Sequence, residues 1–118
     1  MKNMKLKPQR GDIYLANFNP AFGREIRKIR PGVIVQNNIG NQNTPYVIIC
    51  PLSTKLPPQE TNTLISVTPP EAGVKKPSVI LCNFIYTFDK QRLIKKIGTL
   101  LPSTMNKVDF GLTTILDI

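Results

Sequence analysis

The chain has 118 residues, a length typical of one domain that buries about two-thirds of its unfolded surface without disulfides. Sixteen Lys and Arg against seven Asp and Glu give a formal charge of +9, which favours a polyanionic partner such as nucleic acid or an acidic protein. The sequence contains no histidine, and this excludes histidine acid–base catalysis, Ser-His-Asp triads and the usual zinc sites.

The first nine residues are basic, and we expect them to form a flexible tail. They lack the apolar stretch of a signal peptide, and nowhere does the sequence approach the roughly 18 apolar residues of a membrane span. Cys50 and Cys82 each lie inside an apolar run, which favours buried free thiols in a reducing compartment over a disulfide. The sequence therefore predicts one cytoplasmic domain over residues 1–118, with no membrane contact.

Apolar segments rich in β-branched and aromatic residues alternate with turn residues along the chain, and they predict strands. The predicted strands are Ile13–Phe18, the Val33–Val35 run entered at Arg30, Tyr46–Leu52, Thr63–Thr68, Ser78–Phe88 and Leu93–Leu100. The segment Asn38–Asn43 is predicted as a turn, and Asp89–Arg92 as a single helical turn with Asp89 as its N-cap.

One amphipathic helix is predicted at the end of the chain, beginning at Pro102-Ser103, with Gly111 as its weak point. Its apolar face comprises Met105, Val108, Leu112, Ile115 and Leu116. Short strands, frequent turn residues and one late helix predict a mainly β fold: a compact antiparallel barrel with a helix packed on it.

The stretch from Arg30 to Asn37 combines a buried strand with a cation at its entrance. Pro31 restricts Arg30 to extended geometry, and proline suits the first positions of a strand because it has no N–H to donate. Arg30 is thereby placed at the rim of the core, where a fixed cation can bind an anion. Its structural alternative is to cover the end of the barrel or to pair with Glu25.

Several segments follow one another along the chain in a characteristic order and spacing: Arg10–Tyr14, Asn19-Pro20 with Gly23 and Glu25, Arg30–Asn37, Cys50–Ser53, Ser78–Leu81 and Thr87–Leu93. In this order and spacing they resemble the MazF/PemK family of toxin–antitoxin ribonucleases. The resemblance implies a small SH3-like antiparallel barrel (CcdB/MazF-like) with a C-terminal helix, working as a homodimer. It also implies a toxin that cuts single-stranded RNA at short sequences without a metal or cofactor, and that a cognate acidic antitoxin silences.

The resemblance assigns candidate catalytic residues by position. Arg30 corresponds to the catalytic arginine, Glu25 to the acidic residue of the preceding loop, and Ser53 to a position that usually holds a catalytic threonine. Serine keeps the hydroxyl but lacks the methyl group that restricts threonine rotamers. Asn83-Phe84 and Tyr86 also depart from the family, because relatives often carry polar or basic residues there.

These residues suit cleavage by the RNA's own 2′-OH, which gives a 2′,3′-cyclic phosphate and a 5′-OH. Arg30 can bind the phosphate bidentately, and the Ser53 hydroxyl can donate to a non-bridging oxygen. Glu25 is a candidate base, since arginine is a poor one, although the resemblance also gives Arg30 a proton-transfer role. A salt bridge within its own loop is an equal alternative for Glu25.

Candidate RNA-binding residues surround these positions. Basic side chains at Arg24, Arg27 and Lys28 can contact phosphates, and Phe22 can stack on a base or form a hydrophobic plug under the loop. Thr54 follows Ser53, where a hydroxyl can cap a turn or face a cleft. A second basic cluster comprises Lys90, Arg92, Lys95 and Lys96.

Two other functions share this basic barrel. A CcdB-type toxin poisons gyrase by binding a protein, and a non-catalytic barrel binds RNA without cutting it. Arg30 with a hydroxyl at Ser53 favours the nuclease, because a gyrase poison performs no hydrolysis. The acidic residues are scattered along the chain, so the sequence predicts no two-metal site.

Overall fold

The computed structural model describes residues 6–118. The expected flexible tail covers residues 1–9, of which residues 1–5 lie outside the described part. Within the rest, Leu6 packs against a core cluster, Pro8 is buried, and the Gln9 N–H donates to Asp12 Oδ2 at 2.9 Å. The chain is thus attached to the sheet before the first strand begins.

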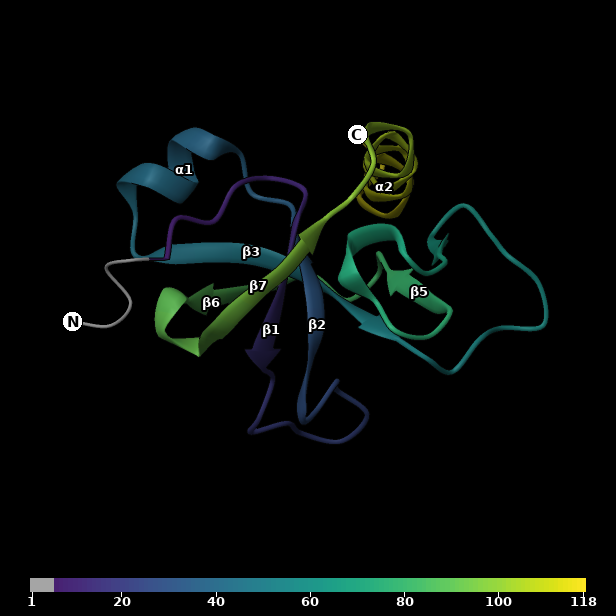
Figure 1. Ribbon diagram of the computed structural model, residues 1–118, viewed down its shortest axis with the longest axis horizontal. Helices are drawn as coiled ribbons and strands as arrows, with labels where there is room; N and C mark the ends of the chain where they lie inside the picture. Colours follow the sequence, from purple (N-terminus) through teal and green to yellow (C-terminus); the bar gives the residue numbers. More distant parts are fainter. Residues whose placement is uncertain (1–5) are drawn as a thin grey trace.

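Seven strands form one antiparallel, barrel-like sheet in the order β4-β5-β3-β2-β1-β7, with β6 paired to β3 off this path (Figure 1). The strands are β1 (Asp12–Asn17), β2 (Ile29–Ile34), β3 (Tyr46–Ser53), β4 (Leu64–Val67), β5 (Ser78–Leu81), β6 (Tyr86–Asp89) and β7 (Leu93–Thr99). Helix α2 (Pro102–Leu116) follows the last strand. The predicted mainly β barrel with a C-terminal helix is confirmed.

The prediction of one long strand over Ser78–Phe88 is wrong. Two strands occupy it, and between them the Phe84 N–H donates to the Leu81 carbonyl at 3.1 Å in a turn. Both strands pair with β3, β5 near its C-terminal end and β6 along its first half. An uninterrupted apolar run does not reveal this break, because each half is buried against a different part of the same neighbour.

The predicted turn over Asn38–Asn43 is a short helix, α1 (Asn38–Asn43). The Asn37 side chain caps it by accepting from the Gly40 N–H at 2.7 Å, and the Thr44 N–H bonds the Gly40 carbonyl at its other end. Asparagine favours both turns and helix N-caps, so the composition did not distinguish them. The helical turn η3 (Lys90–Arg92) is confirmed, with Asp89 Oδ1 accepting from the Gln91 N–H.

Helix α2 begins at Pro102 as predicted and buries Val108. The sequence suggested that Gly111 weakens the helix, but in the structure this glycine allows close packing. A Cβ there would lie 2.8 Å from the Asn62 carbonyl oxygen and 2.9 Å from Cys82 Sγ. The far end of the predicted apolar face is uncovered, since Leu116 is 52% exposed. Within residues 6–118, no helix is long and apolar enough to cross a membrane.

The two ends of the strand order are linked by a 3-10 turn, η2 (Glu71–Gly73), which lies between β4 and β5 and packs against β7. Gly73 has φ +73°, and a Cβ on it would lie only 2.0 Å from the Ile97 carbonyl oxygen. A Cβ on Gly98 would lie 2.3 Å from the Ala72 carbonyl carbon. Glycine is therefore required on both sides of this contact, which brings the segment after η2 alongside β7.

Both cysteines are buried and free, as predicted. Burial, and secondarily the neighbouring Cys82, raises the pKa of Cys50 to about 12, and burial raises the pKa of Cys82 to about 11. Both side chains therefore stay as neutral thiols at physiological pH. Because the thiolate is the nucleophilic form, neither cysteine supplies a nucleophile.

Candidate nucleic-acid interface

Arg30 lies one residue into β2, opposite Ala16 of β1, and its side chain is half-buried. Its Nε donates to the Arg27 carbonyl at 3.0 Å, and its Nη1 lies 3.5 Å from the Leu52 carbonyl oxygen. Among the described residues it has no ion pair, so the alternative of a pair with Glu25 is not realised. The guanidinium is thus oriented by backbone oxygens while its charge remains available to an anion.

Ser53 is the last residue of β3, and the structure brings it close to Arg30. Because β2 and β3 are paired antiparallel neighbours, the Leu52 carbonyl faces Arg30, and this carbonyl belongs to the peptide bond between Leu52 and Ser53. The Ser53 Oγ accepts from the Lys55 N–H at 3.1 Å, so it caps the turn after the strand. A hydroxyl that accepts one hydrogen bond still has its own proton to donate.

Glu25 closes a tight turn in the exposed loop between β1 and β2. Its Oε1 accepts from the Phe22 N–H at 2.7 Å, and its own N–H donates to the Phe22 carbonyl at 3.1 Å. In the part of the chain that the structure describes, it forms no salt bridge with the basic residues of its loop. Its carboxylate therefore orders the loop backbone and keeps its second oxygen free.

The same loop carries four of the five predicted RNA-binding residues on its surface, all except Thr54. Phe22 is 85% exposed, so it does not form a plug under the loop. Arg24, Arg27 and Lys28 are also exposed, and Arg27 donates to the Gly23 carbonyl. One aromatic ring and three cations are thereby presented together on one loop.

A groove of about 370 Å³ lies next to Arg30 and Ser53, and we call it the lysine groove. It is lined by Leu15, Pro31, Thr54, Gly73, Val74, Lys75, Lys76, Ser78, Lys95 and Ile97. Arg30 and Ser53 do not line the groove themselves, but each directly precedes a lining residue, Pro31 and Thr54 respectively. The groove combines an apolar floor with three lysines and no acidic lining residue.

Lys75 and Lys76 are groove residues that the sequence pattern did not single out. The available signal was a pair of adjacent lysines followed by Pro77, immediately before the strong strand that starts at Ser78. The predicted cluster from Lys90 to Lys96 is divided by the fold. Only Lys95 lines the groove, while Lys96 pairs with Asp12 at 3.3 Å.

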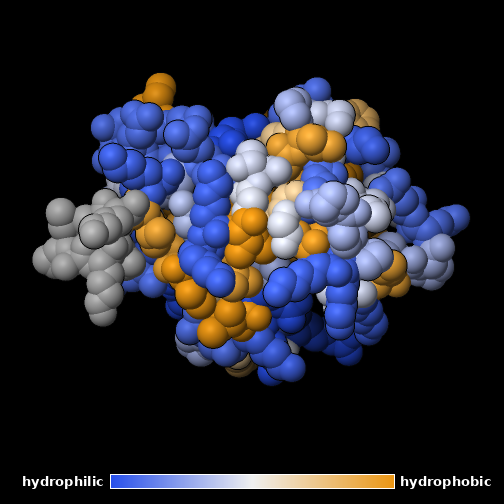
Figure 2. Space-filling model, in the orientation of Figure 1, coloured by the Kyte–Doolittle hydropathy of each residue, from blue (hydrophilic) through white to orange (hydrophobic). Residues whose placement is uncertain are grey.

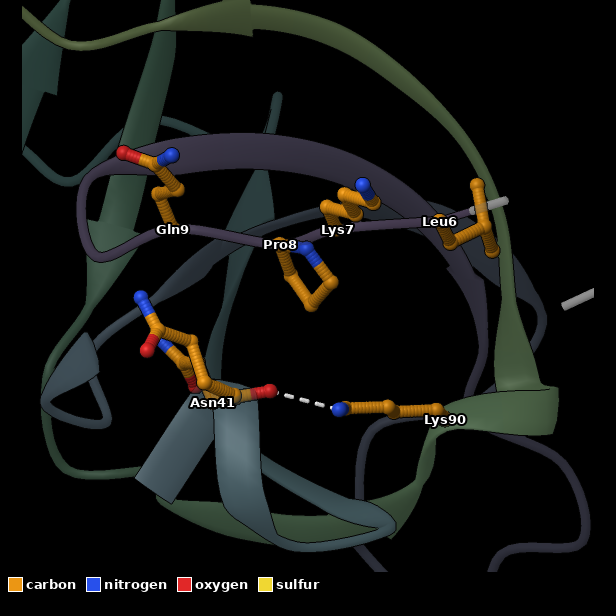
Figure 3. A pocket seen from close by; sticks show the side chains of 7 residues that line it. Leu6, Lys7, Pro8, Gln9, Asn41 and Lys90 are labelled. Carbon is orange, nitrogen blue, oxygen red and sulfur yellow. Dashed lines mark hydrogen bonds between the residues drawn. The ribbon is translucent and has the colours of Figure 1, made fainter. Parts of the chain in front are cut away.

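A second hollow, of about 510 Å³, lies between the N-terminal segment, α1 and Lys90 (Figure 3). Its labelled side chains include Leu6, Pro8 and Gln9, and the Lys90 Nζ donates across it to the Asn41 carbonyl oxygen. None of the candidate site residues lines this hollow. The larger of the two hollows is therefore not the one that borders Arg30 and Ser53.

Within residues 6–118, no group of three or more His, Cys, Asp or Glu side chains lies close enough to hold a metal ion. The two acidic residues that precede Arg30 along the chain, Asp12 and Glu25, are engaged separately. Asp12 is buried and accepts from Gln9 and Thr99, and Glu25 accepts from its own loop. The hydrogen-bond partners that the structure gives the Arg30 and Ser53 side chains are backbone groups: two carbonyls for Arg30 and the Lys55 N–H for Ser53.

The chain matches known proteins over nearly its whole length. A family model described as "PemK-like, MazF-like toxin of type II toxin-antitoxin system" matches residues 9–116. The chain is 36% identical over 104 residues to endoribonuclease EndoA of Bacillus subtilis (strain 168), covering 88% of this chain and 90% of that protein.

Solved structures agree with this match. The chain superposes on an endoribonuclease in complex with its cognate antitoxin from a mycobacterial species, with a TM-score of 0.77 at 26% identity and coverage of 94% and 96% of the two chains. It also superposes on MazF from Deinococcus radiodurans, with a TM-score of 0.83 at 20% identity and coverage of 97% and 100%, which shows the shared fold. The chain therefore belongs to the family of PemK-like, MazF-like toxins of type II toxin–antitoxin systems.

Proposed function

We propose that this toxin is a metal-independent endoribonuclease that cuts single-stranded RNA at short sequences. The RNA's own 2′-OH attacks the adjacent phosphate, leaving a 2′,3′-cyclic phosphate and a 5′-OH. The observation that carries the proposal is the juxtaposition of Arg30 and Ser53 beside the lysine groove. The endoribonuclease among its relatives, at 36% identity, supports the same reaction class.

Arg30 supplies the main transition-state stabilisation in this proposal. As the 2′-oxygen bonds to phosphorus and the 5′-oxygen departs, negative charge grows on the non-bridging oxygens, and a planar guanidinium can bind two of them. The two backbone carbonyls that contact Arg30 support this role, because they hold the group in place before substrate arrives. The Ser53 hydroxyl donates to one of the same oxygens.

Glu25 is our candidate for the base that removes the 2′-OH proton. Arginine stays protonated, so it has no lone pair with which to accept that proton. The free oxygen of the Glu25 carboxylate can accept a proton while the other oxygen keeps its bond to the Phe22 N–H. The leaving 5′-oxygen must gain a proton, which the protonated Glu25 can supply.

RNA binding is assigned to the β1–β2 loop and the lysine groove together. Phosphate contacts from Arg24, Arg27 and Lys28 provide affinity, as do those of Lys76 and the other groove lysines. The exposed Phe22 ring can stack on an unpaired base, and Thr54 lines the groove that the RNA strand would follow. Unpaired bases can reach these surfaces only in single-stranded RNA.

The direct test of this function is cleavage of a long RNA by the purified protein in excess EDTA, followed by analysis of the new ends. We expect fragments with 5′-OH and 2′,3′-cyclic phosphate ends, at a rate that added Mg²⁺ does not increase. Strict dependence on Mg²⁺, or 5′-phosphate ends, would refute the mechanism. Binding without any cutting would leave a non-catalytic RNA-binding barrel.

We also propose a homodimer that binds an acidic antitoxin segment across the same basic surface as RNA. Exposed apolar side chains on and next to α2 support self-association. They are Leu101, Phe110, Ile115, Leu116 and Ile118, and Figure 2 shows part of the hydrophobic (orange) surface at this helix. Binding of an acidic antitoxin segment is supported by the net charge of +9 and by the mycobacterial structure in complex with its cognate antitoxin. We place the dimer in the cytoplasm, where its thiols stay reduced.

Light scattering should give twice the monomer mass of 13.2 kDa, and an acidic antitoxin segment should displace bound RNA and stop cleavage. A monomer that cuts RNA at full rate would contradict the dimer. An antitoxin complex that still cuts at full rate would contradict the shared surface.

A further inference from the structure

The β1–β2 loop is held at its centre by Tyr86, a residue of β6 sixty positions away along the chain. The Ile26 N–H donates to the Tyr86 hydroxyl at 3.0 Å. The Ile26 side chain is also partly buried against the core cluster that includes Phe18 and Phe88. The middle of the loop is thus attached to the barrel by one hydrogen bond and one apolar contact.

The position of the Tyr86 hydroxyl is set by aromatic packing. The Tyr86 ring centroid lies 5.4 Å from that of Phe18 at 86°, and 5.4 Å from that of Phe88 at 46°. Phe18 and Phe88 are themselves buried and 5.0 Å apart. Edge-to-face rings at these distances restrict one another, so the hydroxyl has a defined place.

Arg92 holds the beginning of the same loop. Its Nη1 donates to the Asn17 carbonyl at 3.0 Å and also to the Asn19 carbonyl, and its guanidinium lies 4.8 Å from the centre of the Phe88 ring. The Asn19 side chain in turn accepts from the Lys28 N–H at 2.9 Å. Hydrogen bonds therefore hold the loop at its start and its end, and the bond to Tyr86 holds its middle.

The hydrogen bond between Ile26 and Tyr86 is next in sequence to the carbonyl that orients Arg30. Arg27 directly follows Ile26, and the Arg27 carbonyl accepts from Arg30 Nε at 3.0 Å. A shift of the Ile26 peptide would displace the Arg27 carbonyl and release Arg30 Nε. Only the second contact of Arg30, at 3.5 Å from the Leu52 carbonyl oxygen, would then remain.

We infer that Tyr86 is a positioning residue for Arg30, acting through the Ile26–Arg27 backbone. The inference rests on the proposed function, in which Arg30 must present its guanidinium to the scissile phosphate. Neither Tyr86 nor Ile26 touches RNA in this scheme. The phenol hydroxyl, more than the ring, carries the effect, because the ring packs on the core and only the oxygen bonds the loop.

Tyr86→Phe tests this because it removes the hydroxyl and keeps the aromatic packing. We expect the single-turnover rate at saturating protein to fall about tenfold, with little change in affinity for an uncleavable deoxy analogue or in melting temperature. In the absence of RNA, the Arg30 Nε–H proton should exchange with water about fivefold faster, as measured by NMR on ¹⁵N-labelled protein. Tyr46→Phe is the matched control, since Tyr46 is 51% exposed and its hydroxyl has no partner among residues 6–118. This control should change neither the single-turnover rate nor the Arg30 Nε–H exchange.

In an Arg30→Ala background, Tyr86→Phe should cause no further loss of residual rate, because the group it positions is gone. An unchanged Arg30 Nε–H exchange in Tyr86→Phe would overturn the inference, as would a full tenfold loss that persists without Arg30. If the wild-type protein cut no RNA, the proposed function would fail, and the Nε–H exchange would still decide whether Tyr86 holds Arg30.

Discussion

Replacing Arg30 with alanine should lower the single-turnover rate of RNA cleavage by about 10³-fold, the largest effect expected of any single substitution in the site. The charge of Arg30 matters most when the phosphate carries its greatest negative charge, so the loss falls on the transition state. Binding of an uncleavable deoxy analogue should weaken much less, by about tenfold or under. The measurement is cleavage of a short RNA at saturating protein, alongside a titration with the analogue.

Three further substitutions separate catalysis from binding. Arg30→Lys should restore little activity, because an ammonium group cannot reproduce the bidentate fork of a guanidinium. Arg27→Ala and Lys76→Ala should weaken binding and lower the slope of log affinity against log salt by about 1, while the saturated rate stays close to wild type. If Arg30→Ala cut RNA at nearly the wild-type rate once saturated, Arg30 would be an RNA anchor only.

Ser53→Ala should lower the saturated rate by about 10²-fold, the effect of removing one hydrogen-bond donor from a developing oxyanion. The same change removes the acceptor of the Lys55 N–H, so a displaced turn is a competing explanation. Ser53→Thr distinguishes the two, because it restores both the hydroxyl and the cap and should retain activity. Single-turnover cleavage of the three proteins at saturation makes the comparison.

Thr54→Ala is the neighbouring control for Ser53. Thr54 is exposed and lines the lysine groove, so its loss should affect RNA affinity more than the saturated rate. Equal losses of saturated rate in Ser53→Ala and Thr54→Ala would argue that the turn after β3 matters as a whole. In that case the hydroxyl of Ser53 would have no special role.

The sequence predicted the strands well wherever one apolar run forms one uninterrupted strand. Tyr46–Ser53 and Leu93–Thr99 begin where expected, because Pro45 and the turn at Asp89–Arg92 mark their starts. The run from Ser78 to Phe88 failed because two pairings with the same strand share one hydrophobic pattern. The short helix at Asn38–Asn43 failed because asparagine is typical of both turns and caps.

Part of the candidate site was also predictable from local pattern. Pro31 predicted an extended Arg30 at a strand entrance, and the structure has it in β2 beside the end of β3. The closeness of Ser53 followed only from the resemblance, since no local signal pairs β2 with β3. The roles left open for Phe22 and Glu25 depend on exposure and on loop hydrogen bonds, which a single sequence does not specify.

The lysine groove and the tie to Tyr86 depend on long-range contacts. Lys76 and Lys95 meet on one groove because η2 packs against β7, a contact that needs close backbone approach at Gly73. Ile26 reaches Tyr86 across sixty residues. Neither pairing leaves a periodic or compositional trace, so each becomes visible only once the chain is folded.

The central claim is that the RNA supplies its own nucleophile beside a guanidinium and a hydroxyl, with no metal. It is tested most directly by two short RNAs that differ only by a 2′-deoxy group at the nucleotide before the scissile phosphate. Both are incubated with saturating wild-type protein in EDTA. The all-RNA strand should be cut to a 2′,3′-cyclic phosphate and a 5′-OH, and the deoxy strand should bind equally well and remain intact at that bond. Cleavage of the deoxy strand at the same bond would show that another nucleophile attacks, and it would contradict the proposed mechanism.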